Sequence, residues 1–252
     1  MNFRNSLTAL ILFGAVGCAG IVQAQDALTG MFRLTHTTTE IVGPQSAHSL
    51  SEIIATDEEL QWQVYVPENY QPQRPPGVFV FIDPNGWGGM PDDLRPVFDK
   101  HNLIWIGAKA NERNPTETKR IWMSMLASKA LQGEYAIDLN RLYVGSSGAA
   151  ARTAVNVLMS ANQHSGAVFF RGSQYWHGGQ PEGIDNLQRK YYVFITGTND
   201  KAKTDIRKDY ERYKKDGLEH SKLIFEMKSL GKTASPEHMD EAIRYLDSRL
   251  MR

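Results

Sequence analysis

The 252-residue chain has a single cysteine, Cys18, which lies near its N-terminus. One cysteine cannot form an internal disulfide, so the fold must depend on an apolar core, which a chain of this length can supply. Basic and acidic side chains balance at 28 each, giving a net charge of zero. The basic stripe typical of nucleic-acid-binding proteins is absent. No nucleic-acid partner is therefore expected.

Several cofactor signatures are also missing. The sequence has no His-x-x-x-His pair and no cysteine pair, which are common sources of metal ligands. It has no P-loop and no Gly-x-Gly-x-x-Gly opening a helix, so nucleoside triphosphates and dinucleotides are not expected ligands. The sequence therefore predicts neither a metal site nor a cofactor.

The longest apolar run is at the N-terminus. Residues 7–22 are almost entirely apolar and small, Arg4 precedes them, and Val22-Gln-Ala24 fits the small-x-small cleavage rule. This predicts a signal peptide over residues 1–24 and a periplasmic or secreted single domain over residues 25–252. A membrane anchor is an alternative, but the run is shorter than the roughly 20 residues of a span. A second alternative is a lipoprotein anchored at Cys18. Cleavage after Ala24 would leave no stable membrane span.

Strand-like and helix-like segments alternate along the rest of the chain. Apolar or alternating runs predict strands at residues 31–38, 60–66, 78–82, 103–106, 141–144, 167–170, 191–195 and 222–227. Helical patterns cover residues 116–135, 147–161 and 203–215, and a last helix begins at Ser235-Pro236. This alternation predicts an α/β fold with a mostly parallel central sheet and helices on both faces. Residues 171–189 have little hydrophobic content, so no large lid is expected.

One strand-to-helix junction carries a nucleophile pattern. Ser147 follows the apolar segment 141–144, with Gly145 two residues before it and Ala149 two residues after. Small neighbours at these spacings are typical of a nucleophile elbow, in which a serine sits on a strained turn between a strand and a helix. The pattern predicts Ser147 as the nucleophile.

The other catalytic parts should follow neighbouring strands, because the carboxyl ends of parallel strands meet at one edge. Residues 83–89 form a glycine-rich segment, whose Asn85 or Gly86 N–H is expected to build an oxyanion hole together with Gly148 N–H. A plain glycine-rich turn is the alternative. Asp200 follows the strand at 191–195 and is expected to orient a catalytic histidine, the alternative being a turn or helix-capping aspartate.

Residues 60–250 resemble α/β-hydrolases of the secreted esterase group that includes polyhydroxybutyrate depolymerases and feruloyl esterases. The resemblance rests on Asp138-x-Asn-Arg-Leu-Tyr-Val, Gly145-Ser-Ser-Gly-Ala149, Gly197-Thr-Asn-Asp200, Leu103-Ile-Trp-Ile-Gly-Ala108 and Glu241-Ala-Ile-Arg-Tyr-Leu-Asp247. It implies an α/β-hydrolase fold, Ser147 as nucleophile and Asp200 as acid. The family histidine has no match, because Lys232 stands where it is expected.

The identity of the catalytic base is therefore open. His238, six residues after Lys232, is one candidate, and a desolvated Lys232 is another. His177 lies at the same end of the sheet but precedes Asp200 in the chain, which is the wrong order for this fold. A broken triad is the last possibility.

Two functions follow. The first is a carboxylic-ester hydrolase without a cofactor, in which Trp87, Tyr175, Trp176 and His177 contact a small or polymer-derived ester. The second is a catalytically degenerate homologue that binds a small molecule or a protein.

Overall fold

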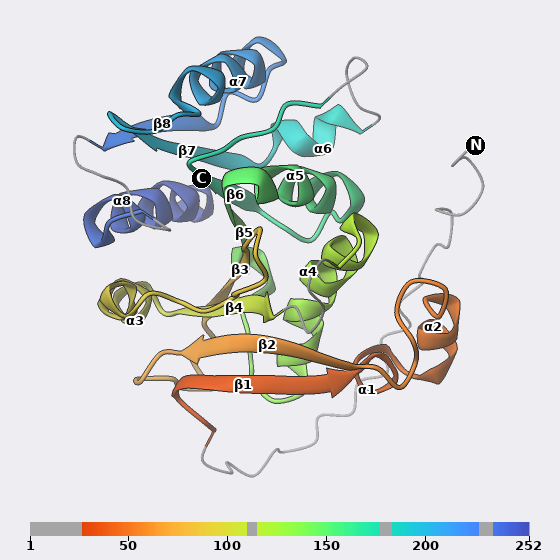
Figure 1. Cartoon of the computed structure of the whole chain (residues 1–252). Coiled ribbons are helices and arrows are strands. Elements are labelled where there is room, and N and C mark those ends of the chain that lie inside the picture. Colours follow the sequence, from red (N-terminus) through yellow and green to blue (C-terminus); the bar gives the residue numbers. More distant parts are fainter. Residues whose placement is uncertain (1–26, 110–114, 177–182, 227–233, 252) are drawn as a thin grey trace.

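A computed structural model describes residues 27–109, 115–176, 183–226 and 234–251 (Figure 1). The predicted signal peptide and Cys18 lie outside these ranges. Eight strands form one sheet in the order β1-β2-β4-β3-β5-β6-β7-β8. The strands are β1 (Gly30–Thr37), β2 (Glu59–Val66), β3 (Gly77–Ile82), β4 (Leu103–Lys109), β5 (Leu142–Ser147), β6 (Gly166–Phe170), β7 (Tyr191–Gly197) and β8 (Ser221–Glu226). β2 runs antiparallel to β1 and β4, and all other neighbours are parallel.

Helices cover both faces of the sheet, as the alternating sequence predicts. The longer ones are α3 (Arg95–His101), α4 (Glu117–Gln132), α5 (Ala151–Ser160), α7 (Lys203–Lys215) and α8 (Pro236–Asp247). Figure 1 shows α3 and α8 on one side of the sheet and α4 and α5 on the other. The bounds of α3 were not predicted from the sequence, and neither were three short helices, α1 (Thr38–Val42), α2 (Pro44–Ser49) and α6 (Ile184–Gln188).

Strand β7 shows how the two faces are filled. Tyr192 and Phe194 point toward α7, where their rings lie 5.1 Å from the ring of Tyr213. Val193 and Ile195 belong to the second core, which includes the buried residues of α3 and α8. A strand with apolar side chains on both faces reads as a continuous apolar run, which is why 191–195 was recognisable as a central strand.

Two aspartates attach α8 to its surroundings. Asp240 Oδ1 lies 2.6 Å from His101 Nε2 and accepts a hydrogen bond from Lys100 Nζ at 2.7 Å. The Lys100 hydrogen bond and the neighbouring His101 lower the pKa of Asp240 to about 2. Asp247, the last residue of the helix, accepts two hydrogen bonds from Arg141 and a third from the Tyr143 hydroxyl. The helix α8 is therefore fixed to the body of the domain near its middle and at its C-terminal end.

Candidate functional site

The carboxyl ends of β3, β5, β6, β7 and β8 bring the predicted site residues to one edge of the sheet. The register pairs Ser147 of β5 with Phe170 of β6, and Phe170 with Ile195 of β7. Gly197, at the end of β7, pairs with Glu226 at the end of β8. The loops after these strands therefore meet at this edge, as in other doubly wound sheets.

The turn after β5 bends one residue later than the sequence predicts. Ser147 is the last residue of β5 and has an extended backbone (φ −119°, ψ 134°), whereas Gly148 has φ +54°. A 3-10 turn at Gly148–Ala150 follows, and α5 begins at Ala151 rather than at Ser147. Glycine adopts positive φ without steric cost, so the bend falls on Gly148. Ser147 is partly exposed at this edge, but its backbone does not have the strained conformation expected of an elbow nucleophile.

The glycines around the turn have different surroundings. A Cβ on Gly145 would overlap the Phe79 ring, and one on Gly172 would overlap the carbonyl of Gly148. A Cβ on Gly148 would meet no atom within 4 Å. The segment after β6 is thus packed against the turn, while the space in front of Gly148 itself is open. Gly172 was missed by sequence reasoning, because no local pattern marks a close approach between distant segments.

The glycine-rich segment after β3 forms hydrogen bonds within itself. Asp83 Oδ1 accepts the N–H of Asn85 at 2.7 Å, and the Asp83 carbonyl accepts the N–H of Gly86 at 3.2 Å. Both backbone donors predicted for the oxyanion hole are therefore engaged within this loop. A Cβ on Gly88 would overlap the β4 backbone, so the glycine there permits close packing. Trp87 is 41% exposed.

Asp200 is buried, and both of its oxygens are occupied. The Thr196 hydroxyl donates to Oδ2 at 2.8 Å, and the Ala202 N–H donates to Oδ1 at 2.9 Å. These hydrogen bonds close the turn that leads into α7. They match the alternative role of a turn-forming aspartate, although the catalytic role of Asp200 stays a prediction.

His238 lies in the first turn of α8. Its Nδ1 is 2.7 Å from Ser235 Oγ and 3.0 Å from Oε1 of Glu226. The acid beside the imidazole is thus Glu226, which sequence reasoning did not select, although its position at the end of the last predicted strand was a usable signal. The other two candidate bases, His177 and Lys232, lie outside the described residues.

Tyr175 and Trp176, predicted to contact substrate, pack toward α7. Their rings stack at 4.8 Å, and the buried Trp176 ring lies 4.9 Å from Tyr213. The Tyr175 hydroxyl donates to Asp216 at 2.6 Å, and this hydrogen bond raises the pKa of Tyr175. Both rings therefore contribute to the packing beneath α7.

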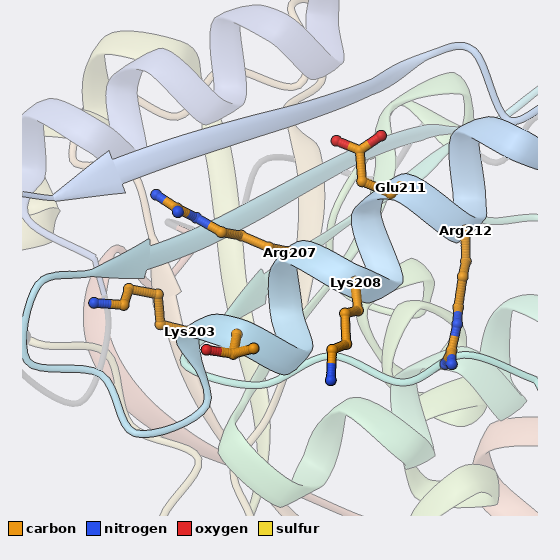
Figure 2. A pocket seen from close by; sticks show the side chains of 6 residues that line it. Lys203, Arg207, Lys208, Glu211 and Arg212 are labelled. Carbon is orange, nitrogen blue, oxygen red and sulfur yellow. The ribbon is translucent and has the colours of Figure 1, made fainter.

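An open depression of about 450 Å³ lies along α7 (Figure 2). It is lined by Lys203, Thr204, Arg207, Lys208, Glu211 and Arg212. Arg207 also lies over the Phe225 ring at 5.1 Å, and Arg212 over the Tyr175 ring at 5.2 Å. The depression contains none of the predicted catalytic residues, so it is a feature of the α7 surface and not of the candidate site.

Among the described residues, no cluster of three or more histidine, cysteine, aspartate or glutamate side chains could hold a metal ion. In the same ranges, no helix is both long and apolar enough to span a bilayer.

Solved structures with a similar architecture include several esterases. Native esterase 2 of the Planctomycetes species Thermogutta terrifontis superposes with a TM-score of 0.57 at 15% identity, covering 86% of this chain and 91% of that one. Its butyrate-bound form gives 0.54 at 16% identity, with coverages of 77% and 90%. A thermostable esterase gives 0.54 at 14% identity, covering 88% of this chain but only 62% of its own length.

The fold is that of the α/β-hydrolases. The strand order and the mixed β1–β2 edge of the sheet agree with this assignment. No protein-family model and no curated protein matches the sequence. Identities this low establish the α/β-hydrolase fold alone, so the chemistry must be argued from the residues.

Proposed function

We propose that this α/β-hydrolase-fold protein is a carboxylic-ester hydrolase with Ser147 as its nucleophile. The observation that carries the proposal is the position of Ser147, partly exposed at the end of β5 where the central strand meets α5. The fold likeness to esterases supports the reaction class. One of those structures holds butyrate, and others are phosphorylated by paraoxon or phosphonylated by sarin.

In the proposed reaction, Ser147 Oγ attacks the ester carbonyl while its proton passes to Nε2 of His238. The tetrahedral intermediate then collapses. The bond from carbon to the alcohol oxygen breaks, and the imidazolium returns the proton to the leaving alkoxide. Water attacks the resulting acyl-enzyme with the same proton transfers, which releases the carboxylic acid and restores the serine.

The described contacts of His238 do not join it to Ser147. Catalytic hydrogen bonds are often long or misaligned without substrate and tighten only in the complex, so the proposal assigns this contact to the substrate-bound state. The oxyanion would be held by the N–H of Gly148 together with that of Asn85 or Gly86. The second donor would have to leave Asp83, with which both of these N–H groups are engaged.

A second candidate function is a binding module that has lost catalysis, and one observation favours it. An elbow nucleophile normally occupies the strained residue at the bend of the turn. Here the residue with left-handed backbone at the bend is Gly148, which has no side chain and has open space in front of it. Such a site could accept a small acyl or aryl ligand without hydrolysing it.

Labelling with a fluorophosphonate probe separates the two candidates. For a hydrolase we expect covalent labelling and turnover of p-nitrophenyl butyrate, with both lost in Ser147→Ala. Ser146→Ala is the matched control, because Ser146 is fully buried and should not react. Absence of labelling and turnover in the wild type would refute hydrolysis through Ser147. A rise in melting temperature with butyrate under those conditions would support the binding module.

We also propose that the protein is exported by cleavage after Ala24. Mass spectrometry of the protein recovered from the periplasm or medium should find Gln25 at the N-terminus. A lipid-modified N-terminus at Cys18 would instead establish the lipoprotein alternative.

A further inference from the structure

Glu226 is a buried acid at the edge of the sheet that carries the candidate site. It is the last residue of β8 and only 4% exposed. Its backbone carbonyl accepts the N–H of Thr198, which belongs to the turn that carries Asp200. Glu226 and Asp200 therefore lie at the carboxyl ends of adjacent strands. Both are candidates for the acid that orients the histidine.

The side-chain contacts distinguish these two acids. Glu226 Oε1 accepts the Ser235 N–H at 2.8 Å and lies 3.0 Å from His238 Nδ1. Asp200 instead uses its two oxygens for Thr196 and Ala202. Within the described part of the chain, the carboxylate next to the imidazole is that of Glu226.

The position of this carboxylate decides which ring nitrogen carries the proton. A carboxylate only accepts hydrogen bonds, so an unprotonated Nδ1 at 3.0 Å would place two lone pairs against each other. A proton on Nδ1 replaces this repulsion by attraction and also allows donation to Ser235 Oγ, 2.7 Å away. Nε2 then carries the lone pair, and it has no hydrogen bond to another described residue. The His238 side chain is 24% exposed, so this nitrogen can be approached.

We propose that Glu226, and not Asp200, is the positioning residue that holds the proton of His238 on Nδ1 and leaves Nε2 as the proton acceptor. The catalytic consequence rests on the proposed hydrolase function. There, the buried carboxylate would also stabilise the imidazolium formed when Ser147 loses its proton. The tautomer itself does not depend on catalysis.

Nitrogen-15 NMR of the purified protein, above neutral pH, tests the tautomer directly. The His238 signals are assigned by their loss in His238→Asn. In the wild type we expect a protonated Nδ1 and an unprotonated Nε2. In Glu226→Gln, which keeps the size of the side chain but removes its charge, the Nε2–H form should become substantially populated, because Ser235 Oγ–H can then donate to Nδ1.

Two control variants isolate the charge of Glu226. Asp200→Asn should leave the tautomer unchanged, and so should Ser235→Ala, which removes the other Nδ1 partner but keeps the carboxylate. The proposal is overturned if the wild type has its proton on Nε2, if Glu226→Gln changes nothing, or if Asp200→Asn produces the change instead.

Kinetics provide a second measurement, provided that the wild type hydrolyses p-nitrophenyl butyrate. Glu226→Gln should lower kcat by roughly 100-fold or more with little change in KM, and Glu226→Asp should recover part of the loss, because the orienting carboxylate acts mainly in the transition state. An inactive wild type with the expected tautomers would refute the hydrolase function and keep the Glu226 assignment. An active enzyme whose kcat is unchanged in Glu226→Gln would support the hydrolase function and refute the catalytic role of Glu226.

Discussion

Gly145 in strand β5 and Gly148 in the turn that follows it should respond very differently to the addition of one methyl group. Gly148 has φ +54° and open space in front of its Cα, whereas a Cβ on Gly145 would overlap the Phe79 ring. The substitutions Gly148→Ala and Gly145→Ala thus compare backbone strain with steric overlap at positions three residues apart. They test the location of the bend, on which the interpretation of Ser147 depends.

The expected magnitudes follow from this geometry. An alanine in the left-handed region costs about 1–2 kcal/mol, and the reduced freedom of the unfolded chain offsets roughly 0.4–1 kcal/mol of it. Gly148→Ala should therefore lower the free energy of unfolding by about 1 kcal/mol. Phe79 cannot move aside easily, because its ring packs against those of Phe98 and Trp105. Overpacking there should make Gly145→Ala cost about 3 kcal/mol or more.

Urea unfolding followed by circular dichroism measures both values. Thermal unfolding should show the same order, with a drop of about 3 °C for Gly148→Ala and roughly 9 °C for Gly145→Ala in a protein of this size. Gly148→Ser should behave like Gly148→Ala, because the added hydroxyl also enters open space. If Gly148→Ala destabilises as much as Gly145→Ala, the turn is not open at Gly148 and our account of it is wrong.

Three other predictions concern stability. Burial lowers the pKa of Lys190 to about 8, so between pH 8 and about 10 the unfolded chain binds more protons than the native one. Stability should rise with pH in this window, and the rise should disappear in urea titrations of Lys190→Met; the same rise in both proteins would contradict it. Asp247→Ala should cost about 3 kcal/mol, because Arg141 and Tyr143 lose their shared acceptor, and a loss below 1 kcal/mol in urea unfolding would refute this. Ser235→Ala should cost about 1 kcal/mol through the lost N-cap of α8, measured in the same way, and no loss would show that the cap contributes nothing.

Most of the architecture was predictable, because the features that define it are local in sequence. All eight predicted strands are present with ends within three residues of those expected, since central strands read as apolar runs bounded by polar turns. The N-terminus of α8 is also correct: Ser235 caps the helix and Pro236 opens it. The short helices α1, α2 and α6 have no extended amphipathic pattern that a sequence window could detect.

The candidate site was less predictable, because its geometry depends on contacts between distant segments. Residues 147–150 are all small and suit either a strand end or a helix start, so the pattern placed the bend at Ser147 and the structure places it at Gly148. The partner of His238 depends on how the end of β8 meets the first turn of α8. A serine–acid–histidine order along the chain fits Asp200 and Glu226 alike, and it contains no information about this contact.

The attachment of α8 at two points, Asp240 and Asp247, has a consequence for the entropy of the site. Asp240 holds the helix to α3 through His101, and Asp247 holds it to the start of β5 through Arg141. His238 is therefore carried by a helix whose orientation is fixed when the chain folds, and ordering its backbone adds nothing to the free energy of binding a substrate. Its imidazole can still change rotamer, but any larger approach to the serine would require α8 to move as a rigid unit.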